Sequence, residues 1–279
     1  MKITIPSPLV SVHWLFENIK ADNLIIFDVS IYKVGTQENK VDSKEQIINS
    51  VLFDLKSVFL NKEGEFPNTI PTKEHFEKEI QKLGVNKDSC IIIYDDLGVY
   101  SSPRAWWLFK LFGFENVAVL NGGLPAWQEA EFPIETYKNK QLLKGNFKAY
   151  FKINYLSTTK DVLIASKNKK HIFDARSKGR FDAILPEPRK DLRGGHIPNS
   201  KSLPHSELQL DGKMKSKEKL QEIFSALNPK KETVIFSCGS GITACILALG
   251  NELAGNTNYS VYDGSWTEWA STLALPVEK

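Results

Sequence analysis

The sequence has few cysteines and no long apolar run. Its 279 residues include three cysteines, an odd number that is too small for a disulfide framework in a chain of this size. We therefore expect free thiols in a reducing compartment, with a cytoplasmic location. No stretch approaches the roughly 18 consecutive apolar residues that a membrane span needs. Pro6, Pro8 and His13 interrupt the first segment, which is not typical of a signal peptide, so we predict no membrane partner.

The sequence also lacks a strong excess of either charge. Its 36 basic and 33 acidic side chains give a formal net charge of +3. Basic and acidic residues alternate along most of the predicted helices, which argues against a nucleic-acid partner and leaves room for a small anionic substrate. The five histidines and three cysteines show no metal-ligand spacing, so no metal is predicted.

What the sequence does contain is a weak internal repeat of strand, helix and strand. The strands are predicted at Leu24–Val29 and Cys90–Tyr94 in the first half, and at His171–Arg176 and Thr233–Ser237 in the second. Apolar residues at helical spacing lie between them: Phe76, Ile80 and Leu83 in the first half, and Leu220, Ile223, Phe224 and Leu227 in the second. Gly84 is expected to end the first of these helices. Buried strands alternating with amphipathic helices predict an α/β fold.

The repeat predicts two tandem domains, each a mainly parallel sheet flanked by helices. Domains of this size agree with the length of the chain. We place the first domain at residues 1–137 and the second at 155–279. The linker is predicted at 138–154, a polar stretch with several lysines and little periodicity.

The two halves differ in the residue that follows the second strand. Ligands of open parallel sheets bind beyond the carboxyl ends of the strands, where the first half offers Asp95 and the second offers Cys238. After Cys238, Gly239 and Gly241 allow backbone N–H groups to converge, and a helix begins with unpaired N–H groups. We therefore predict a thiolate or persulfide at Cys238, held by an anion-binding loop. The loop consists of Gly239, Gly241, Ile242 and Thr243.

The other two cysteines are expected to be packing residues. Cys90 lies within an apolar strand, and Cys245 lies on the apolar face of the helix that follows the Cys238 loop.

The loop Cys-Gly-Ser-Gly-Ile-Thr that begins at Cys238 resembles the active-site loop of the 3-mercaptopyruvate sulfurtransferases, which are two-domain members of the rhodanese family. Members that prefer thiosulfate usually carry basic residues after the cysteine, where this sequence has Gly239 and Ser240. Residues 100–107 and 121–127 resemble the inactive amino-terminal domain of the family, and residues 179–181, 186–189, 195–198 and 262–266 resemble its catalytic domain. The sequence departs from the family at Gln46–Asn49, where a His-Ile-Pro-Gly turn is usual.

The resemblance implies a sulfurtransferase that takes sulfur from 3-mercaptopyruvate onto Cys238 and passes it to a thiol, a thioredoxin-like protein or cyanide. It assigns the carboxylate and keto group of the donor to Arg180 and Arg189, and it gives Ser240 a proton relay or a hydrogen bond to the leaving enolate. No cofactor is implied. From the residues themselves we expect the two arginines on a surface loop and Arg193 as a solvated neighbour. The resemblance implies a structural turn at His196.

Three alternatives remain beside this interpretation. A thiosulfate:cyanide sulfurtransferase would use the same nucleophile. A cysteine phosphatase would need an arginine where this sequence has Ala244. A non-catalytic binding module is a reasonable interpretation of the first half, which has Asp95 in place of a nucleophile, but Cys238 argues against it for the whole chain.

Overall fold

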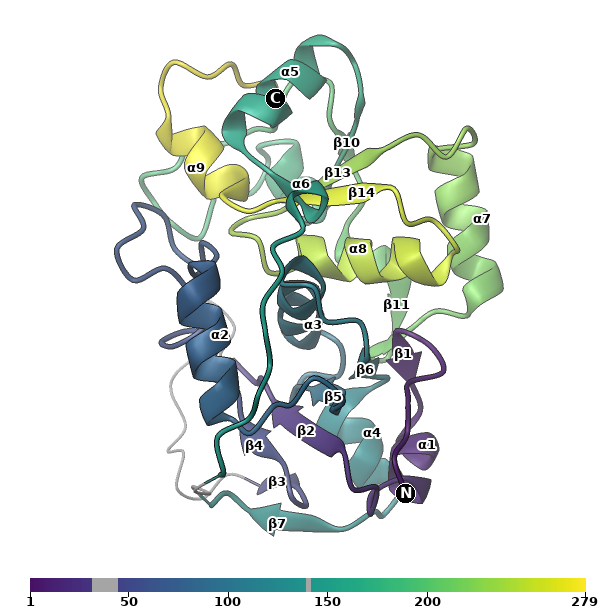
Figure 1. Ribbon diagram of the computed structural model, residues 1–279. Helices are drawn as coiled ribbons and strands as arrows, with labels where there is room; N and C mark the ends of the chain where they lie inside the picture. Colours follow the sequence, from purple (N-terminus) through teal and green to yellow (C-terminus); the bar gives the residue numbers. More distant parts are fainter. Residues whose placement is uncertain (32–44, 139–141) are drawn as a thin grey trace. The chain divides into compact units, whose positions relative to one another are not determined.

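The computed structural model of the protein describes residues 1–31, 45–138 and 142–279, and the chain forms two compact units (Figure 1). Unit 1 comprises Met1–Lys62, Pro71–Phe151 and Asp211–Met214. Unit 2 comprises Glu63–Ile70, Lys152–Leu210 and Lys215–Lys279. Each unit thus includes one short segment from the opposite half of the sequence. The predicted domain limits at 1–137, 138–154 and 155–279 stay a prediction.

Unit 1 is built on a five-stranded parallel sheet with the order β1-β6-β5-β2-β4. Its strands are β1 (Leu9–Val10), β2 (Leu24–Asp28), β4 (Val51–Leu52), β5 (Cys90–Tyr94) and β6 (Val117–Leu120). Its helices are α1 (Val12–Glu17), α2 (Lys73–Lys82), α3 (Ser102–Leu111) and α4 (Gly123–Glu129). Outside the sheet, β3 (Glu45–Ile47) pairs with β7 (Ile134–Thr136) in antiparallel fashion. The short strand β12 (Lys213–Met214) also belongs to this unit.

Both faces of the unit 1 sheet are covered, because every residue of β5 is buried. Alternate residues of a strand point to opposite faces. Ile92 and Tyr94 therefore share one face, where they pack with α1 and α4 in one apolar cluster. On the other face, Phe76 of α2 and Phe109 of α3 form an aromatic cluster with Phe27 of β2. Burial on both faces explains why the strands of the sequence read as continuous apolar runs.

Unit 2 repeats this plan with a second five-stranded parallel sheet, in the order β10-β9-β13-β14-β8. Its strands are β8 (Leu156–Ser157), β9 (His171–Asp174), β10 (Lys201–Ser202), β13 (Val234–Ser237) and β14 (Tyr259–Tyr262). Its helices are α5 (Thr159–Lys167), α6 (Lys178–Phe181), α7 (Lys217–Leu227), α8 (Ala244–Leu253) and α9 (Ser265–Ser271). Two short 3₁₀ turns, η2 (Ile153–Tyr155) and η3 (His205–Leu208), and the strand β11 (Gln209–Leu210) complete the unit.

Helices cover both faces of the unit 2 sheet as well (Figure 1). Trp266 and Trp269 of α9 are fully buried with Ile235 of β13, in a cluster that also contains residues of α5. On the opposite face, Phe224 of α7 packs edge-on against Phe236 of β13. The buried tryptophans of α9 are thus core residues.

The prediction of two tandem α/β domains is confirmed. Read in the reverse direction, the strand order of unit 2 gives the counterpart of each strand of unit 1 in turn. Cys90–Tyr94 is a strand at its predicted bounds, and Gly84 follows the first predicted helix with a φ of 78°. Across the described ranges, no helix is long and apolar enough to cross a membrane.

Candidate functional site

Cys238 lies at the carboxyl edge of the unit 2 sheet and is hydrogen-bonded to the start of α9. Cys238 directly follows β13, and only 1% of its surface is exposed. Its N–H donates to Ser265 Oγ at 3.1 Å, and its carbonyl accepts the N–H of Trp266 at 2.9 Å. These two bonds fix the position from which the side chain of Cys238 projects.

Ser265 is a neighbour of Cys238 that the sequence analysis missed. It adopts a left-handed conformation with a φ of 51°, unusual for a residue other than glycine, asparagine or aspartate. Its hydroxyl donates to the carbonyl of Tyr262 at 2.8 Å and lies 3.9 Å from Cys238 Sγ. Such strain persists where the surrounding structure determines it. Here it holds a hydroxyl beside the sulfur.

The loop after Cys238 exposes backbone donors to any ligand at the sulfur. Gly241 has a φ of 79°, the left-handed turn for which glycine is suited. Among the described residues, the N–H groups of Ile242, Thr243 and Ala244 donate to no protein acceptor, whereas the next N–H, that of Cys245, bonds to the carbonyl of Ile242. Three donors at the start of α8 are thus left for an anion.

Unit 1 has the same turn, but its donors are already satisfied by a carboxylate. Asp95 directly follows β5 and is fully buried. Its Oδ2 accepts the N–H groups of Tyr100, Ser101 and Ser102 at 2.8–3.0 Å, together with the Ser102 hydroxyl at 2.6 Å. Its Oδ1 accepts the N–H of Leu97 at 3.0 Å. The strand–loop–helix turn of this fold therefore binds a negative charge placed just beyond the end of the strand.

Arg180 lies against the backbone of the Cys238 loop. A methyl group added to Gly239 would come 3.1 Å from Arg180 Nη2, closer than most such contacts, so the glycine leaves room for the guanidinium. Glu187 holds that guanidinium through a pair of bonds, at 3.2 Å to Nε and 2.5 Å to Nη2. About a quarter of the Arg180 side chain remains exposed. The guanidinium is thus oriented by protein and still accessible.

Arg189 reaches the same loop through a threonine. Its Nη1 donates to Thr267 Oγ1 at 2.8 Å, and the hydroxyl and N–H of Thr267 both donate to the carbonyl of Gly239, at 2.6 and 2.9 Å. Burial lowers the pKa of Arg189, the charge of Arg180 adds to this effect, and Glu187 and Cys238 oppose it. The two predicted arginines therefore come together with the predicted cysteine.

A buried ion cluster that the sequence did not predict supports Arg180 through Glu187. Arg176 is buried and donates to Asp174 at 2.7 Å and to Glu187 at 2.8 Å, with its guanidinium 4.4 Å from the ring centre of Trp266. Burial acts to lower the pKa of Arg176, but the two carboxylates outweigh it and the pKa is raised. Glu187 thus connects a buried arginine to an accessible one. Asp174, at the end of β9, holds Arg176 in place through these bonds.

Ser240 is held by a residue of Glu63–Ile70, the segment of unit 2 that comes from the first half of the sequence. Asn68 donates from Nδ2 to Ser240 Oγ at 2.9 Å and to the Ser240 carbonyl at 3.2 Å. The sequence indicates a role for Ser240 but none for Asn68. No local pattern marks Asn68, because the two residues are 172 positions apart.

Two expectations about the arginine segment are wrong. Arg180 lies on the short helix α6, not in a loop, because the buried Phe181 anchors this turn by stacking on the ring of His196 at 3.8 Å. Arg193 is not merely solvated. Its guanidinium donates to the carbonyls of Trp269, Ala270 and Thr272 at the end of α9 and of Leu275 beyond it. His196 has the expected structural role, since its Nδ1 also lies 3.0 Å from the carbonyl of Phe181.

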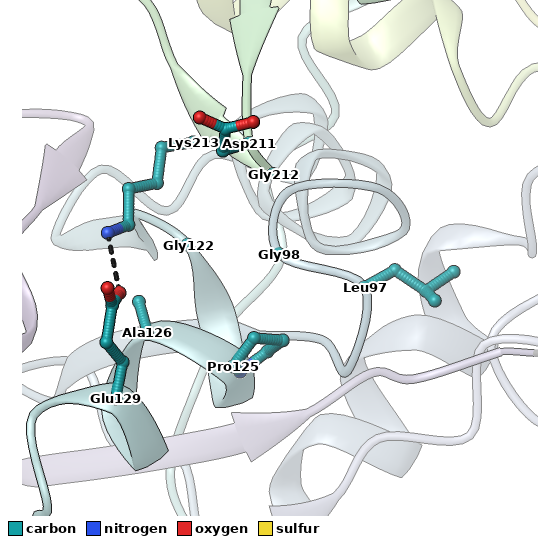
Figure 2. A pocket seen from close by; sticks show the side chains of 9 residues that line it. All are labelled: Leu97, Gly98, Gly122, Pro125, Ala126, Glu129, Asp211, Gly212 and Lys213. Carbon is teal, nitrogen blue, oxygen red and sulfur yellow. Dashed lines mark hydrogen bonds and ion pairs between the residues drawn. The ribbon is translucent and has the colours of Figure 1, made fainter.

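A cavity of about 380 Å³ in unit 1 contains none of the predicted site residues (Figure 2). Backbone of Gly98, Gly122 and Gly212 lines it, and Lys213 and Glu129 form an ion pair at 3.0 Å. A methyl group on Gly98 would lie 2.3 Å from the Gly212 carbonyl, so these glycines serve the close approach of two backbones. The cavity therefore reflects packing and offers no nucleophile.

Comparison with known proteins places this geometry in a family. Residues 11–130 and 159–272 each match the sequence profile of the rhodanese-like domain. These ranges contain both strand–loop–helix turns, the one with Asp95 and the one with Cys238. The chain therefore belongs to the rhodanese family, in a form with two such domains.

Its relatives define the enzyme class more closely. A 3-mercaptopyruvate sulfurtransferase of Escherichia coli is 35% identical over 274 residues, covering 96% of this chain and 97% of that protein. The mitochondrial thiosulfate/3-mercaptopyruvate sulfurtransferase 1 of Arabidopsis thaliana is 34% identical, covering 99% and 79%. The crystal structure of a 3-mercaptopyruvate sulfotransferase from Escherichia coli superimposes with a TM-score of 0.83 at 34% identity, covering 93% of this chain and 99% of that one. The protein is a sulfurtransferase.

Proposed function

We propose that Cys238 carries the transferred sulfur as a persulfide and that 3-mercaptopyruvate is the sulfur donor. The observation that carries this proposal is the corresponding loop of unit 1, whose N–H groups bind the carboxylate of Asp95. Each carboxylate oxygen of Asp95 lies two bonds from Cβ, and Oδ2 accepts three loop N–H groups. The outer sulfur of a cysteine persulfide also lies two bonds from Cβ and is anionic. The free N–H groups of Ile242, Thr243 and Ala244 would hold it in the same way.

The proposed reaction balances without a redox partner or a cofactor. The Cys238 thiolate attacks the thiol sulfur of the donor, and a sulfur–sulfur bond forms as the carbon–sulfur bond breaks. The electron pair of the broken bond moves onto the keto oxygen, which gives the enolate of pyruvate. The proton of the donor thiol is transferred to the enolate carbon, so pyruvate and an anionic persulfide remain.

The arrangement of Arg180, Arg189 and Ser240 supports this donor. A guanidinium binds a carboxylate with paired hydrogen bonds, and mercaptopyruvate offers both a carboxylate and a keto oxygen. Arg180 is oriented by Glu187 and Arg189 by Thr267, so two cationic groups are fixed beside the loop before a donor binds. In our proposal they hold the carboxylate while Ser240 donates to the developing enolate oxygen.

Thiosulfate is the second candidate donor, since the Arabidopsis relative carries both donors in its name. The same arginines and loop N–H groups suit a sulfite leaving group. Mercaptopyruvate is favoured because Gly239 and Ser240 put no cation directly after the nucleophile.

The decisive experiment compares the two donors on the wild-type protein. Steady-state kcat/KM is measured with mercaptopyruvate and with thiosulfate, and intact mass spectrometry follows each treatment. We expect the higher kcat/KM with mercaptopyruvate and one added sulfur atom per chain. A preference for thiosulfate would replace the donor and keep the persulfide, whereas a chain that turns over without any sulfur adduct would refute the persulfide itself.

The same proposal extends to the acceptor, the compartment and unit 1. A thiol or a thioredoxin-like protein would discharge the persulfide, and unit 1, with Asp95 in place of a nucleophile, would act as an inactive scaffold. A cytoplasmic location is proposed because a nucleophilic thiol requires a reducing compartment. Fractionation of cells that express the protein tests the location, and discharge assays with dithiothreitol and thioredoxin test the acceptor.

A further inference from the structure

We propose that Asn68 is a positioning residue that fixes Ser240 as a hydrogen-bond donor toward the departing enolate. The inference rests on the proposed function. It concerns a residue far from the Cys238 loop in sequence, whose side chain touches the hydroxyl that the reaction would use.

Asn68 is built into unit 2 by its own segment, Glu63–Ile70. The N–H of Ile70 donates to Asp263 Oδ2 at 2.8 Å, which fixes the segment to the turn between β14 and α9. Asn68 itself is 7% exposed and has a φ of 64°. Asparagine tolerates this left-handed conformation better than most residues. A buried polar side chain in such a conformation is held where the fold requires it.

The direction of the Asn68–Ser240 bond follows from the second contact of the same amide. The carbonyl oxygen of Ser240 can only accept, and the Asn68 group that lies 3.2 Å from it must therefore be the NH₂ group. That NH₂ group also lies 2.9 Å from Ser240 Oγ and donates to it. The amide orientation is thus determined by chemistry.

The hydroxyl of Ser240 is polarised by this arrangement. One of its lone pairs accepts the Asn68 N–H, so its own proton is directed away from Asn68. A hydroxyl that accepts one hydrogen bond is a better donor in a second, because chained hydrogen bonds strengthen one another. The amide of asparagine has no proton to gain or lose in the physiological range. The Ser240 donor is therefore set independently of pH.

A double-mutant cycle tests whether Asn68 acts through Ser240. The variants are Asn68→Gly, which keeps the left-handed backbone without strain, Ser240→Ala, and both together. The rate of persulfide formation from mercaptopyruvate is measured in single turnovers. We expect each single change to slow it roughly tenfold, the worth of one hydrogen bond, and the double variant to be no slower than Ser240→Ala. Multiplying losses would overturn the proposal.

A second test reverses the polarity of the bond. An ionised Asn68→Asp side chain can only accept, and it would also face the Ser240 carbonyl, whereas its protonated form can donate. The rate of the variant relative to wild type should therefore rise as pH falls through the pKa of the new carboxyl. Asn199→Asp is the matched control, because Asn199 has a similar φ of 62° in unit 2. A flat ratio for Asn68→Asp, or an equal slope in the control, would overturn the proposal.

The two proposals fail in distinguishable ways. If mercaptopyruvate leaves wild-type Cys238 without added sulfur, the proposed donor is wrong and this inference falls with it. If wild type is loaded and the losses at Asn68 and Ser240 multiply, only the role of Asn68 is wrong.

Discussion

At the scale of the residue, the three cysteines differ in what surrounds each sulfur. Burial raises the pKa of the Cys90 thiol to about 11, which keeps it protonated inside its strand. The thiol of Cys245 donates to the Gly241 carbonyl at 3.3 Å on the buried face of α8. Among the three, only Cys238 directly follows a strand and precedes N–H groups that donate to no acceptor in the part of the chain that the structure describes. This difference in surroundings is why we propose Cys238, and neither of the other two, as the nucleophile.

Replacing Cys238 should remove sulfur transfer altogether. Cys238→Ser lacks the nucleophile, so we expect no sulfur adduct in intact mass spectra after treatment with donor. Cys90→Ser and Cys245→Ala should instead lower the thermal midpoint and keep the adduct, because both side chains are core residues. An adduct that disappears with Cys245 and survives loss of Cys238 would reassign the nucleophile.

Replacing Arg189 should impair one half-reaction more than the other. Loss of a hydrogen bond to a charged group costs about 1.5–3 kcal/mol, so Arg189→Ala should lower kcat/KM for mercaptopyruvate about tenfold to a hundredfold. Arg189→Lys should recover little, since an ammonium lacks the planar fork. Discharge of a preformed persulfide to a small neutral thiol should be nearly unchanged, because that step does not use the carboxylate.

Arg193 is the matched control for this prediction. Its guanidinium caps carbonyls at the end of α9, so Arg193→Ala should lower stability without separating the two half-reactions. Single-turnover measurements time persulfide formation and discharge independently. Equal losses in both steps for Arg189→Ala would assign Arg189 to the fold as well.

At the scale of the element, the loop after Cys238 contacts both arginines, Arg180 directly and Arg189 through Thr267. A side chain at Gly239 would press on Arg180, and the Gly239 carbonyl accepts both bonds from Thr267. The combined change Gly239→Arg and Ser240→Lys should therefore raise kcat/KM for thiosulfate and lower it for mercaptopyruvate. Added cations favour a doubly charged donor, and displacement of Arg180 removes part of the carboxylate site. An unchanged ratio of the two kcat/KM values would mean that loop charge does not select the donor.

Glu268 of α9 has a pKa raised above its ordinary 4.5. Burial is the main cause, the charges of Asp263 and Glu65 add to it, and a hydrogen bond with Thr159 opposes it. An acid with a raised pKa in the folded state binds its proton more tightly there than in the unfolded chain. Its contribution to stability is present below pH 4.5 and is lost as pH rises through the folded pKa. Stability should therefore fall with rising pH in this window on account of Glu268.

Glu268→Gln tests this dependence, because the amide does not titrate. The thermal midpoint of the variant minus that of wild type should increase as pH rises from about 4.5 towards neutrality. Glu222→Gln on the exposed face of α7 is the control and should show a nearly constant difference. A constant difference at Glu268 as well would show that its carboxyl is equally solvated in both states.

At the scale of the whole molecule, both units contain the same strand–loop–helix turn, with Asp95 after the strand in unit 1 and Cys238 in unit 2. In unit 1 the turn is closed by Asp95, whose carboxylate accepts five hydrogen bonds. Asp95→Asn turns part of this acceptor into a donor that faces other donors. We expect a loss of about 1.5–3 kcal/mol in unfolding free energy, measured by denaturant titration. The exposed Asp96→Asn should cost little, and loading of Cys238 should be unchanged in both variants while they are folded. A small loss at Asp95 would mean that water replaces its bonds.

How much of the molecule the sequence predicts depends on the distance over which its signals act. The bounds of β5, the asymmetry of Asp95 and Cys238, and the glycine at 241 follow from neighbouring residues and were predicted, and three further strands were predicted to within two residues. The support of the site was not, because its contacts are remote in sequence. Arg189 and Thr267 are 78 positions apart, and Asn68 and Ser240 are 172 apart. The residues that surround each of these positions in the sequence do not indicate its distant partner.

The membership of Glu63–Ile70 in unit 2 has a consequence for dissecting the gene. Unit 2, which contains Cys238, is not encoded by one uninterrupted stretch of DNA. A fragment expressed from residue 152 onward would retain Cys238, Arg180 and Arg189, yet its Ser240 would lack the amide of Asn68. Recombination that exchanges whole halves between relatives would bring mismatched versions of this pair together. We therefore expect the residues at positions 68 and 240 to change together when the two halves of the coding sequence diverge.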